Sequence, residues 1–101
     1  MVLAVVAVVV TLTGSVTRGP VTPVCREGVP CSEPAANVRL TFVRGGASVS
    51  VRTDASGRYR IRLASGTYIV RSSAGMSITP AKVWVRAALP RRNFAIDTGL
   101  R

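Results

Sequence analysis

The chain has 101 residues, a length that suits a single domain with one modest core. Thirteen arginines and Lys82 stand against four acidic residues, and the resulting net charge of +10 favours acidic partners. A GC-rich coding sequence would enrich Arg, Ala, Val and Gly together, so charge alone assigns no ligand. The chain contains no histidine, which removes the commonest general base and the commonest metal ligand.

The first segment of the chain is apolar. Its run from Val2 to Val10 has nine residues, which fits the apolar region of a secretory signal and is short for a spanning helix of about 20 residues. No basic residue precedes the run, and no A-x-A cleavage site follows it. We favour an export signal over residues 1–11, which predicts a secreted or cell-envelope protein that contacts membrane only through this segment, if it is retained. The alternative is a β-branched first strand.

Beyond residue 11 the apolar residues recur with a period of two, which indicates strands. Seven short strands are expected, with turn residues between them: 12–17, 38–43, 48–53, 58–63, 67–72, 81–86 and 92–97. The pattern predicts an all-β fold, a seven-stranded antiparallel β-sandwich over residues 12–101, in which each sheet has one exposed face. In the third strand, Val49 and Val51 are expected to face the core.

One stretch, TDASGRYRIRLASGTYIV from Thr53 to Val70, carries a recognisable motif. Asp54 and Gly57 fit the first and last positions of a type I turn. The motif resembles the pattern T-D-x-x-G-x-[YF]-x-[VIF]-x-L-x-x-G-x-Y-x-[LV] of carboxypeptidase regulatory-like domains, at Thr53, Asp54, Gly57, Tyr59, Ile61, Leu63, Gly66, Tyr68 and Val70. Over residues 12–101 the resemblance implies a transthyretin-like (prealbumin-like) sandwich. It also implies a non-catalytic module that aids folding, spacing or adhesion.

The two cysteines, Cys25 and Cys31, enclose five residues. In an exported chain such a pair predicts a disulfide, worth about 2.4 kcal/mol in the chain-entropy account. The upstream GSVTRGPVTPVC is similar to the start of exported bacterial relatives, in which a Cys pair follows. A zinc site would use closer spacing and more ligands, and a redox pair would use C-x-x-C.

An enzyme is not expected. Transthyretin-like hydroxyisourate hydrolases and intradiol dioxygenases depend on histidines, which this chain lacks. The four acidic residues are scattered and indicate neither a carboxylate pair nor a calcium site: Glu27, Glu33, Asp54 and Asp97. No metal or cofactor is therefore predicted.

Three alternating arginines, Arg58, Arg60 and Arg62, share one face of a predicted strand; we call them the arginine row. Arg52 is expected nearby through a hairpin, and Arg71 from the next strand. Guanidinium groups at this spacing suit phosphates or sulfates, although a charged face also keeps a sheet soluble and discourages edge pairing.

Trp84 lies between Lys82 and Arg86 and is predicted to point outward by alternation. There it could stack on a sugar ring or a base, or it could cover the core or lie under the N-terminal segment. The sequence thus favours a non-catalytic structural or interaction module at the cell surface, with a surface protein or an acidic polymer as partner. The alternative is a polyanion- or glycan-binding module that uses the arginine row and Trp84. Nucleic acid is disfavoured because no recognition motif is present.

Overall fold

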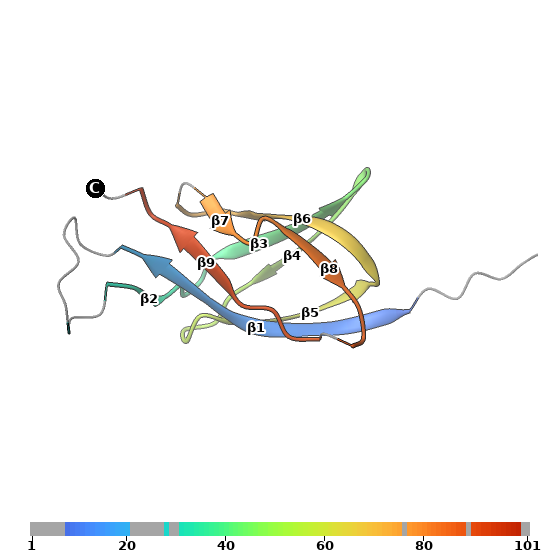
Figure 1. Cartoon of the computed structure of the whole chain (residues 1–101), viewed down its shortest axis with the longest axis horizontal. Helices are drawn as coiled ribbons and strands as arrows, with labels where there is room; N and C mark the ends of the chain where they lie inside the picture. The colour runs from blue at the N-terminus through green and yellow to red at the C-terminus, as the bar shows by residue number, and fades with distance from the viewer. Residues whose placement is uncertain (1–7, 21–27, 29–30, 76, 89, 100–101) are drawn as a thin grey trace, which may run out of the picture.

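The computed structural model describes residues 8–20, 28, 31–75, 77–88 and 90–99. Two sheets, of five and four strands, pack on each other as a sandwich (Figure 1). Within the described ranges there is no helix, and therefore none with the length and apolarity to cross a membrane. The expected all-β, sandwich-like architecture is confirmed.

The five-stranded sheet is built around one long strand, β1 (Val9–Gly19). Its first part pairs antiparallel with β5 (Arg58–Ala64). Its last part lies between β2 (Glu33–Pro34) and β9 (Phe94–Asp97), and β7 (Ser77–Thr79) lies beyond β9.

The pairing of β1 with β9 is parallel, which the antiparallel prediction did not include. After the last strand of the other sheet, the chain crosses over and runs beside β1 in the same direction. Contact begins at the bridge between Thr13 and Arg91 and continues from the Val16–Phe94 pair. One strand of the predicted sandwich therefore enters the sheet in the opposite sense to the one expected.

The four-stranded sheet has the order β4-β3-β6-β8, and all its pairs are antiparallel. Its strands are β3 (Arg39–Arg44), β4 (Ala47–Arg52), β6 (Gly66–Ser72) and β8 (Lys82–Val85). The consecutive strands β4 and β5 belong to different sheets, as do β5 and β6. The chain therefore changes sheet at each of these turns, where the sequence suggested hairpins.

The described residues form nine strands, where seven were predicted. The additional β2 and β7 have two and three residues, too few to show a period of two. In addition, β1 begins at Val9, inside the predicted N-terminal segment, and Val10 is buried opposite Leu63. The last residues of the apolar run thus contribute to the sandwich.

Alternation along the strands builds the core. Phe42 is fully buried, and its ring centroid lies 6.1–6.4 Å from those of Tyr59, Tyr68 and Phe94, which come from both sheets. Most predicted inward residues are confirmed as buried: Leu12, Val16, Val38, Leu40, Phe42, Tyr59, Ile61, Leu63, Tyr68, Val70, Val83, Val85, Phe94 and Ile96.

The prediction for β4 was wrong at Val49, which is 43% exposed, while Val51 is partly buried against the core. β4 is one of the two edge strands of its sheet, and its turn with β3 projects away from the other layer (Figure 1). Val49 pairs with the buried Phe42 and lines a pocket of about 310 Å³ together with Ala64 of β5, so its side chain faces inward but stays open to solvent.

The turn at residues 54–57 has the predicted form. Gly57 N donates to Asp54 O at 3.0 Å, and the φ of +75° at Gly57 requires a glycine. The buried Thr53 hydroxyl donates to Ala35 O and accepts from Val38 N. Gly57 O accepts from Val16 N at 2.7 Å, so this turn ties the start of β5 to β1.

Candidate functional site

The arginine row lies on the outer face of the five-stranded sheet. Its three side chains are exposed, while the alternating Tyr59, Ile61 and Leu63 face the core. The register places each arginine directly opposite a hydroxyl side chain of β1, in the pairs Arg58–Ser15, Arg60–Thr13 and Arg62–Thr11. Along the strand the arginines repeat about every 6.7 Å. The face is therefore a ladder of guanidinium groups beside a ladder of hydroxyl groups.

A fourth arginine joins this face from the opposite side of β1. Arg91 forms a parallel bridge with Thr13, held by Thr13 N to Pro90 O at 3.0 Å and by Arg92 N to Thr13 O at 2.9 Å. Between the strands lies a depression of about 400 Å³, lined by Thr13, Gly14, Ser15, Arg58, Tyr59 and Arg91. Arginines from two segments thus flank one hollow. Arg91 was not among the sequence candidates because nothing in its neighbourhood signals the parallel pairing.

The floor of this hollow is held by close backbone contacts. The Tyr59 hydroxyl donates to Arg92 O at 2.6 Å, and burial raises the pKa of Tyr59, so this group remains a donor. A Cβ at Gly14 would overlap the carbonyl of Arg92, so only glycine fits there. Ser15 N donates to Asn93 Oδ1 at 3.0 Å. The arginines are therefore presented from a fixed surface.

Little acidic charge opposes the row. The Asp54 carboxylate accepts hydrogen bonds from the backbone N–H groups of Arg58 and Ser56, which hold the pKa of Asp54 below its ordinary value; the nearby Arg58 charge acts in the same direction. Arg60 and Arg62 form no ion pair with another described residue, whereas Arg18 Nε pairs with Glu33 Oε1 at 2.7 Å. The middle and far end of the row thus carry unneutralised charge.

The structure does not bring all the predicted binding residues together. Arg52, Arg71 and Trp84 lie on the outer face of the four-stranded sheet, across the core from the arginine row. The expected proximity of Arg52 was wrong because β4 pairs with β3, which places Arg52 opposite Arg39. The single predicted cluster is in fact two surfaces that face in opposite directions.

Trp84 points outward as predicted and is 56% exposed. The guanidinium carbon of Arg86 lies 4.2 Å from the centroid of the Trp84 ring, a cation–π contact. The indole does not cover the core, so the alternative of a core lid does not hold.

The remaining candidates are the cysteines and the acidic residues. Cys25 and Glu27 lie outside the described residues, so the Cys25–Cys31 disulfide stays a prediction. Among the residues that are described, no three His, Cys, Asp or Glu side chains cluster as metal ligands. Asp54 lies in the turn before β5, whereas Asp97 lies at the end of β9, where it accepts from Gly99 N.

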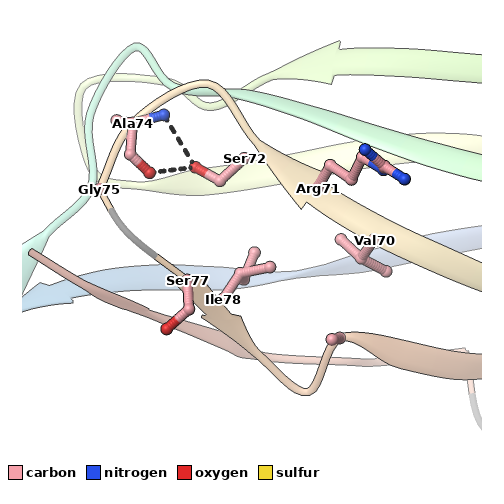
Figure 2. Close-up of a pocket in the computed structure, with 8 residues that line it drawn as sticks. Val70, Arg71, Ser72, Ala74, Gly75, Ser77 and Ile78 are labelled. Carbon is pink, nitrogen blue, oxygen red and sulfur yellow. Dashed lines mark hydrogen bonds between the residues drawn. The ribbon is translucent and has the colours of Figure 1, made fainter.

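A further pocket of about 360 Å³ lies between β6, β7 and the turn that joins them (Figure 2). Val70 and Ile78 supply apolar walls, and the Ser72 hydroxyl is engaged with the backbone of Ala74. Arg71 is the one charged side chain among the described residues of its lining. Ionic groups do not converge here as they do at the arginine row.

Comparison of this chain with protein-family models, with curated proteins and with solved structures finds no match.

Proposed function

We propose that this chain is a non-catalytic interaction module of transthyretin-like type. It acts outside the cytoplasm and binds an acidic polymer through the arginine row. The observation that carries the proposal is the hollow beside Thr13, where Arg58 and Arg91 come from different segments and flank hydroxyl groups. Guanidinium groups and hydroxyls are suitable donors for sulfate, phosphate and carboxylate oxygens.

The charge distribution supports an extended ligand. Three arginines repeat along β5, and none of the strand's residues is acidic. Like charges at this spacing repel one another, and a polymer with regularly placed anionic groups would relieve that repulsion. Repeated contacts of this kind release counterions, so binding should weaken steeply as salt is raised.

The non-catalytic part of the proposal is supported by the composition. The chain has no histidine and four acidic residues, and Glu33 and Asp54 are engaged in local contacts. The transthyretin-like assignment is supported by the two-sheet sandwich and by the Thr53–Gly57 turn that the resemblance contains.

The test is a titration of the oxidised chain with a heparin oligosaccharide, followed through the backbone amide resonances of Thr13 and Ser15. These residues lie opposite Arg60 and Arg58, so their signals report on the row itself. We expect saturable shifts that weaken with salt. The R58S/R60S/R62S variant should lose at least about tenfold in affinity at this site, since charge-assisted hydrogen bonds are removed.

A charge-matched control separates recognition from net charge. The R58K/R60K/R62K variant keeps the charge but lacks the planar fork, so it should bind with intermediate affinity. Absence of any shift at Thr13 and Ser15 with heparin and with polyphosphate at low salt would reject the proposal. Unchanged affinity in the serine variant would also reject it.

A further inference from the structure

The outer face of the four-stranded sheet is a second cationic surface. Register and alternation place on it five basic side chains and the one tryptophan of the chain: Arg39, Arg52, Arg71, Lys82, Trp84 and Arg86. We call this surface the tryptophan face. None of its four strands contains an acidic residue. The core separates it from the arginine row, which points the other way.

Two of the cations on this face repel each other. Arg39 and Arg52 lie directly opposite each other on β3 and β4, and like charges in that position destabilise a sheet. Arg52 Nη1 donates to the Asn37 carbonyl and side-chain oxygens at 3.3 and 3.2 Å, which orients the guanidinium but leaves its charge unpaired. An anionic ligand would offset this repulsion.

Around Trp84 the face has an apolar centre with a charged border. Trp84 lies opposite Thr67, and Ile69, which is 44% exposed, is its diagonal neighbour on β6. Lys82 lies directly opposite Ile69, and Arg86 stacks on the indole ring. Arg86 Nε is buried without a hydrogen-bond partner among the described residues, so the stacking contact holds the guanidinium. This arrangement suits a ligand with both an apolar ring face and an anionic group.

We propose that the tryptophan face is a second binding surface, specific for an acidic glycan, and that the domain bridges two glycan chains. The C–H face of a sugar ring would lie on Trp84 and Ile69, because the electron-rich face of an indole attracts weakly positive C–H groups. Carboxylate or sulfate groups of the sugar would contact Lys82 and Arg71. The bridging part rests on the proposed function of the arginine row, because the second glycan chain binds there.

The number of exposed aromatic rings favours a glycan over a nucleic acid. The chain has five aromatic residues, and all except Trp84 are buried in the core: Phe42, Tyr59, Tyr68 and Phe94. Proteins that hold single-stranded nucleic acid stack successive bases on several aromatic side chains in a groove. One ring on an open sheet offers a platform for a single sugar.

The experiment is a calorimetric titration of the full chain with a sulfated heparin hexasaccharide, with Trp84 fluorescence recorded in parallel. Two double variants are compared, R60S/R62S on the arginine row and R71S/K82S on the tryptophan face. Each removes two positive charges from exposed positions, so the variants match in net charge. Circular dichroism verifies that both fold.

We expect two hexasaccharides per wild-type chain and one per chain for each variant. The fluorescence of Trp84 should respond in the wild type and in R60S/R62S, and the response should be lost in R71S/K82S. A W84A variant should lose one site without any change in net charge.

The possible failures are distinguishable. One site per wild-type chain, lost in R60S/R62S and silent in Trp84 fluorescence, overturns the second face and leaves the arginine row standing. One site lost only in R71S/K82S rejects the row and the bridging but retains the tryptophan face. Tighter binding of a thymidine hexanucleotide than of the hexasaccharide, with stronger quenching of Trp84, overturns the glycan assignment.

Discussion

At the residue scale, Gly14 determines how closely the segment before β9 can approach β1. The Arg92 carbonyl occupies the space that a Cβ at Gly14 would take. The same carbonyl oxygen accepts a hydrogen bond from the Tyr59 hydroxyl. The hollow with Arg58 and Arg91 depends on this close approach. Alternation in the sequence placed Gly14 on the inward side but gave no sign of its neighbour.

We therefore expect Gly14→Ala to destabilise the fold by about 3 kcal/mol, because the added methyl forces two backbone segments apart. Urea unfolding measures this loss. Gly46→Ala is the matched control, since a Cβ there meets nothing within 4 Å, and it should change stability by less than about 1 kcal/mol. Equal effects of the two substitutions would contradict the close approach.

Asp54 gives the fold a pH dependence. Its folded pKa lies below the ordinary value of about 3.9. A lowered folded pKa stabilises the fold above the unfolded pKa, and this contribution is lost as pH falls through the folded value.

The Asp54→Asn variant keeps an oxygen for the N–H groups of Ser56 and Arg58 but lacks the charge. It should be less stable than the wild type at pH 6, and the difference should shrink below about pH 4. Urea midpoints at pH 3 and pH 6 test this expectation. A difference that is constant with pH would mean that the carboxylate charge has no part in the turn.

At the element scale, β1 is the strand on which the five-stranded sheet depends, because it pairs with β2, β5 and β9. Its start at Val9 overlaps the segment predicted to direct export. Val9, Val10 and Thr11 pair with the end of β5, and the Val10 side chain belongs to the core. An export signal over residues 1–11 would remove Val9, Val10 and Thr11 on cleavage, whereas the sandwich uses these residues in β1.

A chain that starts at residue 8 should be more stable than one that starts at residue 12. The shorter chain loses three ladder pairs and the buried Val10 side chain, which alone contributes about 2 kcal/mol. Thermal and urea unfolding of the two chains give the comparison. Equal stability would show that residues 8–11 are dispensable, as an export signal over residues 1–11 requires.

At the scale of the whole molecule, the sandwich converts one basic composition into two separate surfaces. Among the described residues, each sheet keeps its apolar side chains inward and carries exposed cations outward, so these cations lie on faces that point in opposite directions. Binding at both faces, as proposed above, would let one domain engage two ligands at once. When a long anionic polymer is in excess, separate polymer chains should occupy the two faces of each domain. At a stoichiometric ratio, each domain should instead link two polymer chains to each other.

The sequence by itself determined which side chains are buried in most strands, because the period of two follows from backbone geometry alone. It also determined the Asp54–Gly57 turn, whose residue types have local conformational reasons. Only the tertiary structure decided which strands are neighbours, because pairing depends on contacts between segments far apart in the chain. That is why Arg91 lies beside the arginine row and why Arg52, Arg71 and Trp84 lie on the opposite sheet. It is also why Val49 of β4 is exposed although alternation predicted it to be buried.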